Sequence, residues 1–138
     1  MESLVAILIL TIVAIAAYAG LHTAIGLSAS HKESAVAETL LRTAAERLQD
    51  PTSAYVPRAG CPGAGTYGGL PTRSGYAPID VEVRFWTPPG SVAVPSLTTQ
   101  FAPAGTCPGT DPGLQAIELS ITTPSGDTER LEIVKRAS

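Results

Sequence analysis

The chain begins with an apolar run that is long enough to cross a lipid bilayer. No residue from Leu4 to Leu21 is charged, and the next formal charge after Glu2 is on Lys32. A bilayer core about 30 Å thick needs roughly 20 apolar residues in a helix, because each residue rises about 1.5 Å. Residues 4–27 meet that length. The sequence therefore predicts a membrane-spanning helix at the start of the chain.

The predicted helix continues beyond the apolar run. No proline occurs between Met1 and Asp50, and the run lacks the basic start of a cleaved signal peptide. Residues 28–50 carry apolar residues at helical spacing, namely Ala37, Leu41, Ala44 and Leu48, widened by Val36, Leu40 and Ala45. Pro51 should end the helix, because the residue before a proline is disfavoured in the helical conformation. We expect one helix over residues 1–50, with a transmembrane half at 1–27 and an amphipathic half at 28–50.

The composition changes abruptly after the helix. All 12 prolines and 11 of the 13 glycines lie in residues 51–138. Three segments there alternate apolar and polar residues with the period of a half-buried strand, beginning near Ile79, Ile117 and Arg130. The turn sequence at 124–127 should join the last two segments as an antiparallel hairpin. We predict an α+β fold in which the long N-terminal helix covers an antiparallel sheet of three or four strands.

A domain of this size buries only a modest core, so a covalent cross-link is expected. Cys61 and Cys107 are the only cysteines. They make a poor zinc site, because His22 and His31 lie in or beside the membrane half. A disulfide between Cys61 and Cys107 is the favoured interpretation, and it would stabilise the fold by about 4 kcal/mol on the chain-entropy model. Such a bond fits a domain outside the cytoplasm.

Two loops rich in glycine and proline are predicted between the helix and the strands. The first loop, residues 51–78, contains Tyr55, Tyr67 and Tyr76. Tyrosines among glycines can bind carbohydrate or stack on nucleic acid, but they more often anchor a loop on a sheet, and we favour anchoring. The second loop contains the apolar run 92–97, which could form a short edge strand.

Glu2 lies at the mouth of the apolar run, where a carboxylate is stable only beside water, a hydrogen-bond donor or a cation. One interpretation places Glu2 in the headgroup region, solvated and close to its own α-amino group. The other interpretation pairs it with the α-amino group of a second copy when such helices bundle. Position alone favours the first interpretation.

The first residues read Glu2-Ser3-Leu4-Val5-Ala6-Ile7-Leu8-Ile9-Leu10-Thr11-Ile12-Val13-Ala14-Ile15. This run resembles the amino terminus of type IV pilins and type II secretion pseudopilins. In that family a leader peptidase cuts just upstream, the new amino terminus is methylated, and a glutamate a few residues in guides each subunit into a helical filament. Glu2 matches that glutamate. The family places a glycine, the cut and several residues before it, whereas this chain has only Met1. We therefore expect that Met1 is a misassigned GTG start and that the leader lies upstream.

The resemblance is specific over residues 1–25. It implies a pilin-like fold and a structural subunit of a type IV pilus-like or type II secretion pseudopilus filament, and the short proline-rich domain resembles that of a minor pilin. The implied partners are other pilin subunits packed helix to helix, the inner membrane before assembly, a prepilin peptidase and an assembly platform. The implied location is the cytoplasmic membrane, crossed once with the C-terminal domain outside, and then a filament on the cell surface.

Gly20 and Gly26 interrupt the helix near the membrane boundary. Each costs up to about 1 kcal/mol relative to alanine. Close packing between membrane helices is the favoured explanation, because small residues allow it. The alternative is a stretch that unwinds when the subunit leaves the bilayer, as happens in filaments of the resembled family.

The soluble part offers no clear chemistry. It has no histidine, no nucleophile motif and no phosphate-binding glycine loop, so we predict no enzyme, no metal and no cofactor. Asp80, Glu82 and Glu129 are interpreted as solvated strand residues sharing a face. The domain is near neutral, and we interpret its adjacent basic pair, Lys135 and Arg136, as a solvated chain end. Nucleic acid is therefore a disfavoured partner.

Two functions of different classes remain open. The first is a filament subunit that assembles through its N-terminal helix. The second is a signal-anchored extracytoplasmic binding domain that does not polymerise. Glu2 discriminates between them, because assembly requires its carboxylate, whereas anchoring should tolerate or prefer Glu2→Ala since removing a charge eases membrane insertion.

Overall fold

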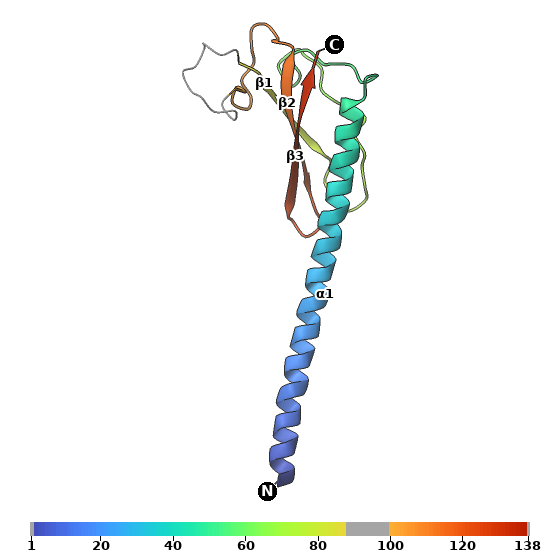
Figure 1. The fold of residues 1–138 in the computed structure, drawn as a ribbon, viewed down its shortest axis with the longest axis vertical. Helices are drawn as coiled ribbons and strands as arrows, with labels where there is room; N and C mark the ends of the chain where they lie inside the picture. The colour runs from blue at the N-terminus through green and yellow to red at the C-terminus, as the bar shows by residue number, and fades with distance from the viewer. Residues whose placement is uncertain (1, 88–99, 138) are drawn as a thin grey trace.

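The computed structural model describes residues 2–87 and 100–137 of the chain. Figure 1 shows a long rod whose N-terminal half projects away from a small sheet, while its C-terminal half lies against that sheet. The elements are α1 (Glu2–Gln49), β1 (Asp80–Phe85), β2 (Leu114–Thr122) and β3 (Thr128–Arg136). The sheet is antiparallel, and its three strands have the order β1-β2-β3. The predicted α+β arrangement of one long helix on an antiparallel sheet is confirmed.

The helix ends at Gln49, one residue before the predicted end at Asp50. The Asp50 amide N–H still donates to the Glu46 carbonyl oxygen (2.9 Å), and the Asp50 carboxylate accepts a bond from the Thr52 amide N–H (2.7 Å). The hydrogen bonds from Thr52 lower the pKa of Asp50. This turn and the following Pro51 carry the chain out of the helical conformation.

The amphipathic half of α1 packs on the sheet through the predicted stripe. Ala37 and Ala44 are completely buried, and Leu41 and Leu48 are 2% and 3% exposed. Val36 and Leu40, which were expected to widen the stripe, are only half-buried. The helix lies against β2 and β3. The alanines allow a close approach, so the central strand can bury its large side chains, Ile117, Leu119 and Ile121, under the helix.

The predicted hairpin joins β2 and β3. Thr122 pairs with Thr128 at its end, and the Gly126 amide N–H donates to the Thr123 carbonyl oxygen (3.0 Å). Gly126 has a φ of 95°, a conformation that side-chain-bearing residues rarely adopt. In the sheet, Ile117 lies opposite Val83 on one side and Ile133 on the other, which aligns the apolar face.

A short segment extends the sheet beyond β1. The Ala102 amide N–H donates to the Phe85 carbonyl oxygen (2.7 Å), and Trp86 and Phe101 form an isolated antiparallel bridge. The edge strand predicted at 92–97 lies outside the described residues. Segment 100–102 therefore supplies the pairing that the structure describes on this edge of β1.

The predicted disulfide is confirmed. Cys61 and Cys107 are bonded, with their Cα atoms 5.8 Å apart. Cys61 is buried and Cys107 is exposed. The bond ties the loop at 51–78 to the segment that leads into β2, so the two glycine- and proline-rich parts of the domain are held together covalently.

Candidate assembly surface on the N-terminal helix

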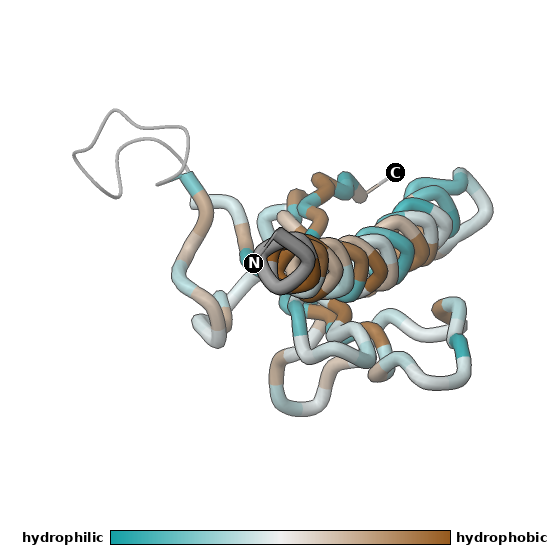
Figure 2. The backbone as a smooth tube through the Cα atoms, turned by 90° about the horizontal axis from the view of Figure 1, so that it is seen from below, coloured by the Kyte–Doolittle hydropathy of each residue, from teal (hydrophilic) through white to brown (hydrophobic). Residues whose placement is uncertain are grey.

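The N-terminal half of α1 exposes a continuous apolar surface. The large apolar side chains that the structure describes between residues 7 and 27 are 55–73% exposed; they are Ile7, Ile9, Leu10, Ile12, Val13, Ile15, Tyr18, Leu21, Ile25 and Leu27. These positions surround the helix on all sides, because successive residues are rotated by about 100°. Figure 2 shows the apolar colouring concentrated in this part of the rod.

Within the described residues, α1 is the one helix long and apolar enough to cross a membrane. None of its most apolar 18-residue window is buried inside the fold. The two threonine hydroxyls of the N-terminal half are satisfied within the helix, since Thr11 Oγ1 donates to the Ile7 carbonyl oxygen (2.8 Å) and Thr23 Oγ1 to that of Ala19 (3.0 Å). An apolar surface this large needs a cover of lipid or of other protein.

The predicted site residues of the helix lie along this half. Glu2 is the first residue of α1, and its side chain lies outside what the structure describes, so its pairing stays a prediction. Gly20 and Gly26 lie inside an unbroken helix, and a Cβ added at either would meet nothing within 4 Å. Nothing within one chain therefore requires glycine at these positions. Both proposed explanations, packing against another helix and unwinding, involve events outside the single chain.

One carboxylate, that of Asp111, connects the loops of the domain. Asp111 accepts hydrogen bonds from the Tyr55 hydroxyl (2.6 Å), the Gly113 amide (2.8 Å), the Gln115 side-chain amide (3.2 Å) and the Arg58 amide. Arg58 has a positive φ of 53°, which this bond helps to hold. Burial raises the pKa of Asp111, but the hydrogen bonds outweigh it and hold that pKa below its usual range.

A fully buried glutamine connects this carboxylate to the core. Gln115 Oε1 accepts a bond from the Tyr67 hydroxyl (2.9 Å), and Gln115 Nε2 donates to the Val56 carbonyl oxygen (2.9 Å). The Tyr76 hydroxyl donates to the Glu33 carbonyl oxygen (3.3 Å), which fixes the same loop on α1. The prediction that the tyrosines anchor the loop on the sheet is confirmed for Tyr67, whereas Tyr55 bonds to Asp111 before β2 and Tyr76 bonds to α1.

The interpretation of Lys135 as a solvated chain-end residue is wrong. Lys135 is 8% exposed, and its Nζ donates to the carbonyl oxygens of Leu48 and Ser53, the latter at 2.9 Å. Its ammonium lies 5.8 Å from the centre of the Tyr67 ring. It caps the C-terminal turn of α1, where carbonyl oxygens attract a cation. Burial lowers the pKa of Lys135, and the Asp50 carboxylate opposes this effect.

The outer face of the sheet is charged. Glu118 lies directly opposite Glu82 on one side and Glu132 on the other. Arg84 forms an ion pair with Glu132, and Arg130 lies 3.5 Å from Glu118, so the arginines offset the repulsion within this row. Across residues 2–87 and 100–137, no three His, Cys, Asp or Glu side chains are grouped to hold a metal ion.

One predicted grouping of acids on this face is incorrect. Asp80 and Glu82 do share the exposed outer face of β1. Glu129 instead lies opposite Ile121, a residue buried under α1, so it belongs to the other face of the sheet. The period of two within β3 places it there, together with Leu131 and Ile133.

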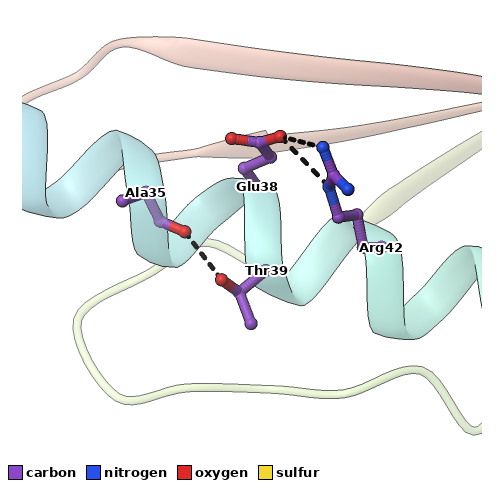
Figure 3. A network of polar contacts seen from close by, with 4 residues as sticks. All are labelled: Ala35, Glu38, Thr39 and Arg42. Atoms are coloured by element: carbon purple, nitrogen blue, oxygen red, sulfur yellow. Dashed lines mark hydrogen bonds and ion pairs between the residues drawn. The ribbon is translucent and has the colours of Figure 1, made fainter.

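An open groove runs between α1 and β3, with a volume of about 690 Å³. Apolar residues line it from both sides, namely Ala35, Leu41 and Ala45 on the helix and Leu131 and Ile133 on the strand. Glu38 and Arg42 stand at its helix side, paired at 2.6 Å. Figure 3 shows this pair on the side of α1 that faces the strands, whereas Thr39, bonded to the Ala35 carbonyl oxygen (2.8 Å), points to the other side. The i,i+4 spacing of Glu38 and Arg42 is visible in the sequence, whereas the groove is not.

Comparison with protein-family models, with curated proteins and with solved structures finds no match for this chain.

Proposed function

We propose that this chain is a structural subunit of a type IV pilus-like or type II secretion pseudopilus filament, of the minor-pilin kind, which assembles through α1. One observation carries the proposal. A single uninterrupted helix joins an apolar half that the domain leaves bare to an amphipathic half that packs on the sheet. Lipid covers residues 7–27 before assembly, and the apolar helices of other pilin subunits cover them in the filament. The change of surroundings requires no refolding of the domain.

Glu2 selects assembly over simple anchoring in this proposal. A carboxylate within a bundle of apolar helices is strongly destabilised unless a cation neutralises it. The α-amino group of a neighbouring copy can supply that cation. The run from Glu2 to Ile15 supports this role, because it resembles the family in which such a glutamate guides assembly.

The proposal includes a location and partners. The chain crosses the cytoplasmic membrane once with its domain outside, and it later becomes part of a filament on the cell surface. The Cys61–Cys107 disulfide supports an oxidising compartment for the domain. A prepilin peptidase and an assembly platform follow from the resemblance of the first residues.

The test compares sheared cell-surface fractions from cells that express the chain with its native upstream sequence. We expect the wild type in that fraction with a processed, methylated amino terminus. We expect Glu2→Ala to stay in the membrane and Glu82→Ala, an exposed acid on the outer face of the sheet, to behave as the wild type. If wild type and Glu2→Ala both remain in the membrane unprocessed, the chain is an anchored extracytoplasmic domain.

A further inference from the structure

Strand β3 is an open edge of the sheet. Among the described residues β2 is its only neighbouring strand, and β3 contains neither proline nor glycine. The Ala137 amide N–H donates to the Gly113 carbonyl oxygen (2.9 Å), so Ala137 faces the β2 side. Because the backbone groups of successive strand residues point to opposite sides, those of Arg130, Glu132 and Val134 point away from β2. Their N–H and C=O groups form a free edge to which another strand can add.

The groove lies along this edge. Its strand wall, Glu129–Ile133, is five residues long, or about 17 Å in an extended chain. The helix runs alongside, because the Ser125 amide N–H donates to the Glu33 carboxylate (3.0 Å) at one end and Lys135 Nζ donates to the Leu48 carbonyl oxygen at the other (Figure 1). The groove therefore has the length of a short strand, and it opens between the helix and the free edge.

The central charged side chains of β3 do not close the edge. Arg130 and Glu132 belong to the outer face of the sheet, where Arg130 lies 3.5 Å from Glu118 and Glu132 forms an ion pair with Arg84. Both partners come from β2 or β1, so these ion pairs hold the charged groups over the sheet. Charged side chains that stay free along an edge are a common obstacle to strand addition. Here the two central charges are engaged on another face.

The groove contains two acids without a counterion. Glu46 and Glu129 line it, and neither forms an ion pair with a residue that the structure describes, whereas both arginines of its walls are already paired within the chain. Glu129 begins the strand wall. Glu46 lies near the other end, two residues before Leu48, whose carbonyl oxygen accepts the bond from Lys135. Leu131 and other apolar side chains line the groove between the two acids.

We propose that the groove between α1 and β3 binds an extended segment of a partner protein, which adds to the free edge of β3 and directs two basic side chains toward α1. Backbone hydrogen bonds supply affinity in this mode of recognition, and alternate side chains supply specificity. Alternate residues of a strand share one face, so the inward positions of the partner carry a basic, an apolar and a basic residue. The basic groups meet Glu129 and Glu46. The inference concerns the domain alone and goes beyond the proposed filament function.

A designed peptide is the probe. It reads Thr-Lys-Thr-Val-Thr-Lys-Thr, is blocked at both ends and carries a fluorophore, and its lysines and valine share one face of an extended chain. Fluorescence anisotropy measures its binding to the full chain in zwitterionic detergent micelles, with protein-free micelles as the blank. We expect the lysine peptide to bind about tenfold more tightly than a peptide with glutamine at both lysine positions. Equal binding of the two peptides, or no saturable binding of the lysine peptide, would overturn the proposal.

Methylation of single peptide nitrogens tests the strand pairing separately from the charges. Neighbouring N–H groups of a strand point to opposite sides, so only one of the third and fourth residues can donate to β3. We expect N-methylation at one of these two positions to weaken binding at least about tenfold, and at the other to change it less than about threefold. Equal effects at both positions would show that the peptide does not add to β3 as a strand.

Substitutions in the protein locate the site. Glu46→Gln and Glu129→Gln should each weaken binding of the lysine peptide about threefold and leave binding of the glutamine peptide unchanged. Glu82→Gln is the matched control, because Glu82 lies exposed on the outer face of β1. All three variants should keep the wild-type melting temperature in micelles. If the three bind the lysine peptide equally, the groove is not the site and the proposal fails.

Discussion

At the scale of single residues, the polar side chains under the C-terminal end of α1 explain how the domain is held together there. Gln115 and Lys135 lie directly opposite each other on β2 and β3, on the face that the helix covers. Tyr67 contacts both, through its hydroxyl and its ring. Gln115, Lys135 and Tyr67 each have hydrogen-bond partners, so burial does not leave these three side chains unsatisfied.

Lys135→Met should destabilise the domain by about 1–3 kcal/mol, because the carbonyl oxygens of Leu48 and Ser53 lose a buried donor. The substitution also removes the cost of burying the Lys135 ammonium charge, which offsets part of this loss. Arg136→Met is the matched control, since Arg136 is exposed, and it should change stability by less than about 0.5 kcal/mol. Urea unfolding of the full chain in micelles measures both. Equal stability of the two variants would show that Lys135 does not cap the helix.

Asp111→Asn should destabilise the fold at pH 7 by about 1–3 kcal/mol, because the amide replaces an acceptor by a donor among four donors. The folded pKa of Asp111 is below its unfolded value of about 3.9. The stability that its ionised form contributes is therefore complete above that value and is lost as the pH falls through the folded pKa.

Unfolding measured between neutral and strongly acidic pH checks this prediction. The difference between wild type and Asp111→Asn should shrink in the acidic part of that range. A difference that stays constant down to the lowest pH would show that the Asp111 charge does not stabilise the loops.

The sequence could have revealed some of these residues. Continuing the alternation of Ile117, Leu119 and Ile121 backward reaches Gln115, and continuing that of Leu131 and Ile133 forward reaches Lys135. The period of two thus placed both on the covered face. Their partners are carbonyl oxygens and hydroxyls from distant loops, and no local pattern encodes those. Asp111 is similar, because its donors come from residues 55 to 115.

At the scale of elements, the packing of α1 on the sheet depends on small side chains. Ala37 and Ala44 are fully buried where the helix crosses β2 and β3. Helical periodicity was sufficient to predict this face, and strand alternation was sufficient to predict the hairpin, because both are properties of single elements. The groove between α1 and β3 could not be predicted, because it depends on the lateral position of the helix over the sheet.

Ala44→Leu should destabilise the domain by about 1–3 kcal/mol, because the added atoms have no space between helix and sheet. Thr39→Leu places the same side chain on an exposed side of α1 and should change stability by less than about 0.5 kcal/mol. Thermal unfolding followed by circular dichroism distinguishes them. A neutral Ala44→Leu would indicate that the helix and sheet are more loosely packed than described.

At the scale of the whole molecule, the chain consists of a rigid domain and a bare apolar rod that share one helix. A hydrophobic core, the Cys61–Cys107 disulfide and the hydrogen bonds to Asp111 stabilise the domain. The domain does not bury the described side chains of residues 7–27. Length and composition of the first residues predicted this division. What covers residues 7–27 depends on other molecules. We propose that lipid covers them before assembly and other subunits cover them in the filament.

The most direct test is a cryo-electron microscopy reconstruction of sheared filaments that contain the chain. We predict that residues 7–27 lie at the filament centre, covered by the apolar helices of other subunits, with the domain that follows α1 on the outside. The helix at Gly20 and Gly26 would be seen directly as packed or unwound. Filaments that expose residues 7–27 to solvent, or filaments that lack this chain, would contradict the proposed function.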